Sequence, residues 1–338
     1  MKRWMTAISA AALIAASSFT TATTATAAGL KDPVQLRVAS FRQGSSWYVY
    51  GVTLGELLRK ALPEGSQIDT PPLGGGTANP LLVARGKADI GLSFAVVNRW
   101  AREGSELFDA PQTDLRTLMG GFDQYYLGMI ANRPDAAGTL SGYVDELGPE
   151  KRIMLLRRGS FGSYAGEQVL GEIGAGEDAV AEAGGSYTFT DFSTVKSAFP
   201  AGRTDLFIQV MTRGHPAITE IAETTDVTFL EPGDDTLATL QEKYGWQAAT
   251  LQPGAFRGQD QALRLPGTTT SLVVSKDMSD ELAYTIVKTV CENQDAFRAG
   301  HKALADFDCA SDAWRAENLG MPLHPGAKRY YREQGWLE

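Results

Sequence analysis

The sequence alternates short strand-like segments with longer helix-like ones, and this alternation is its strongest constraint on the fold. Val34, Leu36 and Val38 alternate with polar residues, and a polar turn and a run of leucines at helical spacing come next. A second turn and a second helical run lead to another apolar segment at 88–93. Strand, helix and strand in this order predict a parallel sheet that is covered by helices.

The same alternation restarts near the middle of the chain. Apolar strand-like segments occur at 153–156, 187–190, 206–210 and 227–230, with helical runs at 165–171, at 193–199 and from Pro216. Farther on, we expect Ser279 to cap a helix whose apolar stripe contains Leu282, Ile286, Val290 and Phe297. A chain of 338 residues has room for about two domains with a core each, so we expect two α/β lobes.

The charge and the cysteine content exclude several classes of protein. Asp and Glu number 40 against 31 Lys and Arg, and the formal net charge of -9 argues against nucleic acid or an anionic membrane as the main partner. Only two cysteines occur, Cys291 and Cys309, so a cysteine-rich zinc site and an iron–sulfur cluster are excluded. The pair could form a disulfide or stay unpaired, because sequence spacing does not give the Cα separation that a bond requires.

The start of the chain has the layout of a secretory signal peptide. Lys2 and Arg3 are positive, the stretch 4–19 is uncharged, and Ala25-Thr26-Ala27 fits the small-x-small pattern of a cleavage site. The alternative is an uncleaved anchor, but the apolar stretch is shorter than the ~20 residues that span a bilayer as a helix. We therefore predict a cleaved signal over 1–27 and a periplasmic location.

Three turns between a strand-like and a helical segment share one composition. They are Arg42-Gln43-Gly44-Ser45-Ser46-Trp47-Tyr48, Gly74-Gly75-Gly76-Thr77-Ala78-Asn79 and Arg158-Gly159-Ser160-Phe161-Gly162-Ser163-Tyr164. The turns that follow parallel strands lie at one edge of a sheet, and the free N–H groups at helix starts bind carboxylate or phosphate. We therefore predict an anion site to which all three turns contribute.

Each of these features also has a purely structural explanation. A Gly/Ser turn before a single helix is explained by a tight turn and an N-cap. Trp47, Tyr48 and Tyr164 could pack in the core, and Arg42 and Arg158 could be ordinary surface residues. The recurrence of glycine and hydroxyl residues in all three turns favours the binding interpretation.

Several segments resemble the TAXI family, which comprises extracytoplasmic solute-binding receptors of TRAP transporters. The similar segments are GSSWYVYG (44–51), GGGTANPLLVARGKADIGLS (74–93), 159–163, 203–207, and 322–327 followed by Arg329-Tyr330-Tyr331. The resemblance implies an α/β, two-lobed periplasmic binding protein-like fold of type II, a Venus flytrap with a hinge of two crossing strands. It also implies a receptor that is not an enzyme and has no cofactor. Such a receptor binds a small organic acid, an amino acid or a dicarboxylate such as glutamate or 2-oxoglutarate, and delivers it to a membrane permease.

By position, the resemblance places the ligand contacts in the three turns and at two strand ends. Together with Arg42 and Arg158, the candidate residues are Ser45, Ser46, Trp47, Tyr48, Thr77, Asn79, Ser93, Ser160, Ser163, Tyr164 and Gln209. We expect lobe one to hold residues 28–122 and 272–338 and lobe two to hold 123–271. The hinge is expected near Gln124 to Ala131 and near Leu265 to Ser271, in a monomer that has no nucleic-acid partner.

The main alternative is an exported serine hydrolase. The segment 91–95 approximates a nucleophile elbow around Ser93, and Asp205 and His324 would complete a catalytic triad. The fifth position of the elbow is Ala95 instead of glycine, and no HGGG-type oxyanion loop is visible. The segment 74–77 lacks the Gly-Lys of a P-loop, and the three histidines are far apart and outside any H-E-x-x-H motif. Neither a nucleotide site nor a metal site is therefore predicted.

Overall fold

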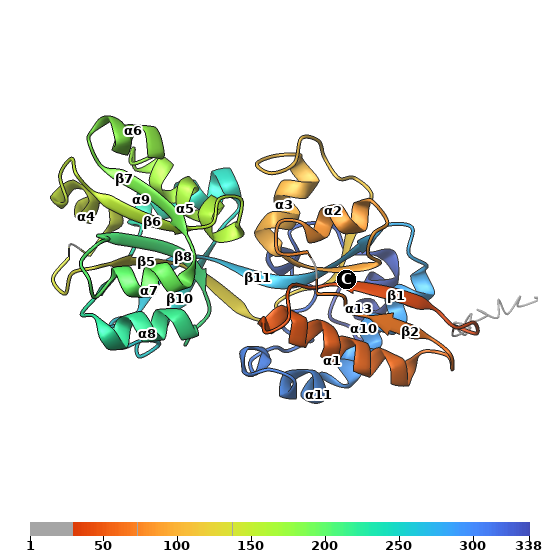
Figure 1. Ribbon diagram of the computed structural model, residues 1–338. Helices are drawn as coiled ribbons and strands as arrows, with labels where there is room; N and C mark the ends of the chain where they lie inside the picture. Colours follow the sequence, from red (N-terminus) through yellow and green to blue (C-terminus); the bar gives the residue numbers. More distant parts are fainter. Residues whose placement is uncertain (1–29, 73, 137) are drawn as a thin grey trace, which may run out of the picture.

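The structure is a computed structural model that describes residues 30–72, 74–136 and 138–338. Its two lobes lie side by side and are joined by two strands (Figure 1). The predicted signal peptide, residues 1–27, lies outside the described residues. No helix in the described part of the chain is both long and apolar enough to cross a membrane.

Lobe one is a mixed sheet that is covered by helices. Its strands are β1 (Gln35–Ala39), β2 (Gln67–Asp69), β3 (Ile90–Phe94), β4 (Leu115–Met119) and the end of β11 (Leu263–Ser275). β1 pairs in parallel with β2 and β3, and β11 runs antiparallel to β3 and β4. The helices are α1 (Ser46–Ala61), α2 (Asn79–Ala84), α3 (Ala95–Glu103), α10 (Asp280–Glu292), α11 (Gln294–Ala299), a 3-10 turn (Lys302–Leu304), α12 (Ala316–Leu319) and α13 (Pro325–Glu333).

Lobe two is built in the same way. Its strands are β5 (Gln124–Ala131), β6 (Arg152–Leu156), β7 (Ser186–Thr190), β8 (Leu206–Met211), β9 (Thr228–Leu230), β10 (Gln247–Leu251) and the first part of β11. β6 pairs in parallel with β7 and β8, and β5 runs antiparallel to β8 and β9. The helices are α4 (Leu140–Glu146), α5 (Phe161–Glu172), α6 (Glu177–Glu182), α7 (Phe192–Ala198), α8 (Pro216–Thr224), α9 (Asp234–Thr239) and a π-helical turn (Leu240–Tyr244).

The two lobes therefore repeat one arrangement of strands. The order is β2-β1-β3-β11 in lobe one and β7-β6-β8-β5 in lobe two, with three parallel strands followed by an antiparallel one. The predicted two-lobed α/β fold is confirmed, and so is the restart of the alternation in mid-chain. The predicted parallel pairing is confirmed for β1, β2 and β3, and β5 and β11 add antiparallel strands because each enters its sheet from the opposite lobe. Such long-range pairing leaves no mark in a local apolar pattern.

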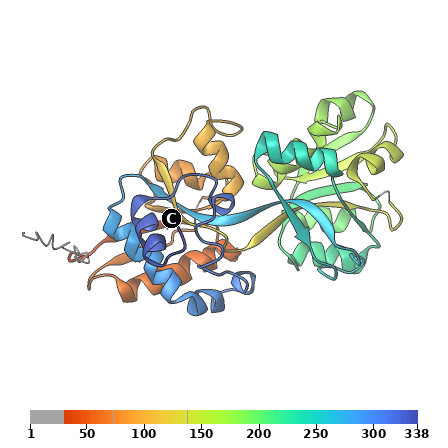
Figure 2. The ribbon, with the colours of Figure 1, turned by 180° about the vertical axis from the view of Figure 1, so that it is seen from behind.

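Two neighbouring strands carry the chain between the lobes. β11 pairs with β10 and β5 through 263–269 and with β3 and β4 through 270–275. β5 begins at Gln124, and its first three residues pair with β11. Figure 2 shows these two strands from behind, where they cross the space between the lobes together. The two crossings are thus hydrogen-bonded to each other.

The C-terminal helices differ from the prediction in one detail. Ser279 caps α10 as predicted, because its hydroxyl accepts a hydrogen bond from the Leu282 N–H at 3.2 Å. The helix ends at Glu292, however, and Phe297 lies on the separate helix α11. Phe297 packs against Phe122, with 5.0 Å between ring centroids, instead of extending the apolar stripe of α10.

A disulfide joins Cys291 to Cys309, with 5.5 Å between their Cα atoms. The structure thereby decides between the two states that the sequence left open. The bond spans 18 residues of chain, and the loop that it closes contains His301, Lys302 and Asp306. These three side chains line the cavity between the lobes.

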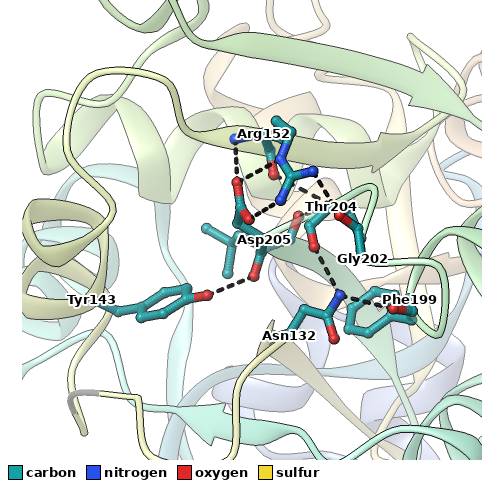
Figure 3. A network of polar contacts seen from close by, with 8 residues as sticks. Asn132, Tyr143, Arg152, Phe199, Gly202, Thr204 and Asp205 are labelled. Atoms are coloured by element: carbon teal, nitrogen blue, oxygen red, sulfur yellow. Dashed lines mark hydrogen bonds and ion pairs between the residues drawn. The ribbon is translucent and has the colours of Figure 1, made fainter.

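In lobe two, an aspartate links the neighbouring parallel strands β6 and β8 (Figure 3). Asp205, just before β8, accepts hydrogen bonds from the backbone N–H (2.8 Å) and from Nε (3.0 Å) of Arg152 on β6. Arg152 also donates to the Gly202 carbonyl at 2.6 Å. Asn132 and Tyr143 add hydrogen bonds to the carbonyls of Thr204 and Asp205, respectively, at 2.9 Å. The carboxylate therefore fixes the register of β6 against β8.

Lobe one contains the same link. Asp89, just before β3, accepts from the backbone N–H (2.8 Å) and from Nε (3.3 Å) of Arg37 on β1. Arg37 donates to the Gly86 carbonyl at 2.9 Å. The segments 86–89 and 202–205 therefore occupy equivalent positions in the two lobes.

Candidate functional site

A cavity of about 1280 Å³ lies between the lobes, and both lobes line it. Lobe one contributes the bends before α1 and α2 and the end of β3, and lobe two contributes the bends before α5, α7 and α8. The start of the crossing strand β5, the end of β10 and the loop that the disulfide closes complete the wall. All three polar turns noted in the sequence contribute residues to this cavity.

The first bend presents the N-terminus of α1. Ser45 caps the helix, because its Oγ accepts from the Tyr48 N–H at 3.2 Å and donates to the Arg42 carbonyl at 2.7 Å. The N–H groups of Ser46 and Trp47 belong to the first turn and have no intrahelical partner. Since α1 is 16 residues long, its dipole places partial positive charge at this point of the cavity.

The matching bend of lobe two presents the N-terminus of α5. Ser160 accepts from the Ser163 N–H at 3.2 Å, and the Ser163 hydroxyl donates to the Ser160 carbonyl at 2.9 Å. Phe161 and Gly162 follow in the first turn and line the cavity. A Cβ at position 162 would come within 1.6 Å of the Gln209 Oε1, so a larger residue there would displace the Gln209 amide. Two helix N-termini, one from each lobe, thus border the same space.

Two further helices of lobe two begin at the cavity, and they differ in how they are capped. Asp191 caps α7 with its carboxylate, which accepts from the Thr194 N–H at 3.0 Å and offsets the positive end of that helix. α8 begins with Pro216 and has no side-chain cap. Of these two helices, only α8 therefore leaves its N-terminus open to an anion from the cavity.

The glycine bend before α2 is built around the buried amide of Asn79. Its Nδ2 donates to the carbonyls of Ala39 (3.1 Å) and Ser40 (2.8 Å) at the end of β1 and of Leu92 (2.7 Å) in β3. Its Oδ1 accepts from the Gly75 N–H at 2.8 Å. Both polar atoms of Asn79 are therefore used to hold the bend against the ends of the two strands.

The charges around the cavity favour an anion. Arg42, Arg213 and Lys302 line it, and none of them lies within 4 Å of a carboxylate of the described chain. Arg157 also lines it and pairs with Asp191, with 3.6 Å between the charged atoms. The chain has a formal net charge of -9, so three cations without an ion pair at one cavity create a local positive potential, opposite in sign to the charge of the whole chain.

A buried carboxyl group lies just before the crossing strand β5, in the wall of the cavity. Asp123 is 6% exposed and accepts hydrogen bonds from the Tyr50 hydroxyl (2.8 Å) and the Thr270 N–H (3.2 Å). Burial raises the pKa of Asp123 to about 6, although the two hydrogen bonds act in the opposite direction. Because Thr270 lies on β11 and Tyr50 on α1, this carboxyl joins both crossings to the helix that borders the cavity.

Two histidines and a glutamine add polar groups to the wall. Burial lowers the pKa of His215, and burial together with Lys302 lowers that of His301, so both rings are neutral at pH 7. The His215 Nδ1 and the Gln209 Oε1 are buried and lack a hydrogen-bond partner in the described structure. Gln209 is 7% exposed, so a ligand in the cavity can satisfy its amide.

The structure brings about half of the candidate residues to the cavity. Those that line it are Arg42, Ser45, Ser46, Trp47, Thr77, Ser160 and Gln209. Those that lie outside its lining are Tyr48, Asn79, Ser93, Arg158, Ser163 and Tyr164.

The residues outside the lining are held elsewhere by their own contacts. Ser93 and Ser163 are fully buried. Arg158 lies over the ring of Phe189 at 3.7 Å and pairs with Glu177 at 2.8 Å. Arg158 thus follows the ordinary surface interpretation that the sequence left open. With Tyr164 it borders a second, smaller groove instead.

Sequence reasoning missed several lining residues. Arg213 and His215 lie in the bend after β8, and they could have been found because that bend is the lobe-two equivalent of the turn after β3. Asp123 lies just before the crossing strand β5 and Tyr125 lies within it, and such a crossing has no local sequence signal of its own. Lys302 reaches the cavity on the loop that the disulfide closes.

The structure does not support the alternative of a serine hydrolase. The Ser93 Oγ is buried and makes no hydrogen bond within the described residues, so no base is within reach to activate it. Asp205 is bound to Arg152 in lobe two. His324 uses its Nδ1 to accept from the Gly326 N–H at the start of α13.

Comparison with solved structures defines the class of fold. MatC from Rhodopseudomonas palustris, solved with bound malate, is 14% identical over 90% of this chain and 98% of that chain, with a TM-score of 0.50. A TctC solute binding protein from Polaromonas is 13% identical over 90% of this chain and 96% of that chain, with the same TM-score. The chain thus has the two-lobed fold of solute-binding proteins.

The family follows from the sequence itself. A model of the NMT1-like family matches residues 38–335, which cover both lobes, both crossing strands and every residue that lines the cavity. The chain belongs to the NMT1-like family.

Proposed function

We propose that this protein is a periplasmic receptor that binds an organic acid between its lobes and delivers it to a membrane transporter. The observation that carries the proposal is the pair of helix N-termini, α1 from one lobe and α5 from the other, that border one cavity together with uncommitted cations. A carboxylate held between them would be bound by both lobes at once, and it would therefore favour their closure.

The resemblance of the turns and of the tail to the TAXI family supports a TRAP-type permease as the partner. We further propose a cleaved signal over residues 1–27, lobe one from 28–122 and 272–338, and lobe two from 123–271. The Asp123–Thr270 hydrogen bond, which joins the two crossings, supports a hinge at these boundaries. The ligand residues proposed are the seven predicted ones that line the cavity.

Titration calorimetry with a panel of organic acids tests the proposal. We expect at least one acid to bind with a micromolar Kd, and sugars and neutral amides not to bind. A bound acid also raises the melting temperature by mass action. Binding of a sugar or of a neutral amide in place of every acid would contradict the assignment of a carboxylate ligand.

A further inference from the structure

Helix α3 of lobe one contacts lobe two on one side of the crossing strand β11. Figures 1 and 2 show α3 beside the segment 234–244, whereas α7, α8 and α11 lie on the opposite side of β11. Trp100 of α3 is fully buried, and its Nε1 donates to the Tyr244 carbonyl at 2.7 Å. A side chain of lobe one is thus anchored to the backbone of lobe two.

Arg99, next to Trp100, binds the same π-helical turn of lobe two. Its guanidinium donates to the carbonyls of Gln241 (3.3 Å) and Glu242 (3.1 Å). Gly245 ends this turn with a φ of +80°, and a Cβ there would come within 2.4 Å of the Arg99 Cδ. The turn therefore leaves room for an arginine of the other lobe at its C-terminal end, where the helix dipole favours a cation.

Glu106, in the loop after α3, forms a second bridge to lobe two. Its carboxylate accepts from the Gln168 Nε2 of α5 at 2.9 Å, and the buried Gln168 Oε1 accepts from the Trp246 Nε1 at 3.0 Å. Glu106 is the one non-glycine residue with a positive φ, +56°, in the described part of the chain. This conformation is unfavourable for glutamate and persists where surrounding contacts hold it, as this bridge does.

Aromatic rings cover one another at the centre of this contact. Phe161 of lobe two stacks on Phe94 of lobe one, with 4.2 Å between ring centroids and 21° between ring planes. Trp246 stacks with Phe161 at 5.6 Å and 19°. All three rings are buried. Separation of the lobes at this point would expose them to water together with Trp100, so their burial stabilises the contact as it stabilises a core.

The opposite side of the cavity is built differently. There the cavity is lined by the loop 301–306 of lobe one and by the bends 190–192 and 212–217 of lobe two. Within the described residues, no hydrogen bond or ion pair joins this loop to these bends. Lys302 and Arg213, two cations without an ion pair, lie on these segments. The lobes are therefore joined on the side of α3 and free of each other on the side that carries these cations.

We infer that the α3 interface, formed by Arg99, Trp100 and Glu106 with their partners in lobe two, is the fixed side of the molecule and that the ligand enters from the opposite side. Lobe motion is then a rotation about this interface and the crossing strands, and it opens the gap between the loop 301–306 and the bends before α7 and α8. The α3 interface stays formed in the empty protein, because protein groups alone make its contacts. The inference concerns the direction of opening and holds for any ligand, so it goes beyond the proposed function.

Distances between paired spin labels on the ligand-free mature protein test the inference. The pair Arg102→Cys/Gln241→Cys spans the α3 interface, and the pair Ser193→Cys/Ala305→Cys spans the opposite side. All four side chains are exposed, and none lines the cavity. We expect the distance distribution of the second pair to be at least about twice as wide as that of the first. An equal or greater width for the pair across the α3 interface would overturn the inference and leave the proposed function intact, since calorimetry tests that function separately.

Variants that remove the bridges test whether these contacts hold the lobes together. Arg99→Ala/Glu106→Gly removes the polar contacts of both side chains with lobe two, and glycine tolerates the φ of +56°. We expect the distribution across the α3 interface to become at least about 1.5-fold wider. Arg59→Ala is the matched control and should leave it unchanged, because Arg59 donates to the Ile68 carbonyl at 2.5 Å within lobe one. An unchanged width in the double variant, with both variants folded by circular dichroism, would overturn the role of the bridges.

Discussion

Both lobes link two strands through an aspartate and an arginine, but the two pairs differ in their exposure and in their hydrogen bonds. In lobe two the Asp205 carboxylate is 18% exposed, whereas in lobe one the Asp89 carboxylate is 33% exposed. Arg152 engages both oxygens of Asp205, whereas Arg37 engages only Oδ2 of Asp89. Lobe one contains the disulfide instead. Equivalent folds are thus stabilised by different means, and the repeated arrangement of strands does not indicate which residues carry the stability.

The bends differ in the same way. Arg42 and Arg158 both introduce a Gly/Ser turn before a helix, but Arg42 faces the cavity without an ion pair while Arg158 pairs with Glu167 and Glu177. Lobe one therefore supplies a cation to the cavity from this position and lobe two does not. Four experiments test how far this comparison holds, in order of decreasing expected effect.

Removal of the disulfide should have the largest effect on stability. The double variant Cys291→Ser/Cys309→Ser frees a loop of about 18 residues, and loop-closure entropy predicts a loss of about 3 kcal/mol in the free energy of unfolding. Urea denaturation of the oxidised wild type and the variant measures the loss. Acid affinity should also fall a few-fold, since the loop carries Lys302. A loss below about 0.5 kcal/mol would indicate that other contacts hold the loop.

Replacement of the two equivalent aspartates compares the lobes directly. Asp205→Ala should lower the free energy of unfolding by about 2 kcal/mol, because the Arg152 guanidinium loses its partner and the Arg152 backbone N–H is left without an acceptor. Asp89→Ala should lower the free energy of unfolding by about 1 kcal/mol or less. The Arg37 N–H also loses its acceptor, but the Asp89 carboxylate is 33% exposed against 18% for Asp205, so water replaces it more readily. Parallel chemical denaturation of the two variants provides the comparison, and a larger loss for Asp89→Ala would reverse it.

The two arginines should differ in their effect on binding. Arg42→Ala should weaken acid binding about tenfold, because it removes a cation that faces the cavity. Arg158→Ala should leave the Kd within about twofold of the wild type, since this side chain pairs with Glu167 and Glu177 and lies outside the cavity lining. Calorimetry with one acid on both variants is sufficient. Equal losses would show that Arg158 acts on the ligand after all.

The smallest expected effect is a dependence of affinity on pH. The pKa of Asp123 is raised to about 6, so this group takes up a proton as the pH falls from 7.5 to 5.5 and removes a negative charge from the cavity wall. An acid ligand with a pKa near 4 stays ionised in this range, and its affinity should rise a few-fold. The folded state also holds this proton more tightly than the unfolded state, so the free energy of unfolding should rise in the same interval.

Asp123→Asn is the control for this prediction. The variant should bind acid at pH 7.5 about as well as the wild type does at pH 5.5, and most of the pH dependence should disappear. His215 and His301 face the same cavity and have lowered pKa values, so any dependence that remains below pH 6 belongs to them. An unchanged slope in the variant would assign the effect to the histidines alone.

The parts of the molecule that could be predicted from the sequence are those with local causes. The strand at 35–39, the helix that Ser279 caps and the turns before α1 and α5 follow from alternation, capping and glycine content. The antiparallel crossings, the partner of Arg158 and the course of the loop at Lys302 depend on residues far away in the chain. Those contacts decided which candidate residues reached the cavity.

Asn79 illustrates the same limit within a single turn. In the sequence it stands beside Thr77 as one more polar group near a glycine bend, and the two look interchangeable. Its burial and its three carbonyl partners are visible only once β1 and β3 are in place. Thr77, two residues earlier, lines the cavity.

The amide of Asn79 also has a consequence for redesign of this protein. Its nitrogen faces three carbonyl oxygens, so an aspartate of the same shape would bring a negative oxygen against all three and open the bend. The Thr77 side chain makes no such hydrogen bonds in the described structure. Substitutions at position 77 can therefore change which ligand the cavity binds, while the hydrogen bonds of Asn79 keep the bend in place. This makes the bend a suitable site for redesign of ligand specificity.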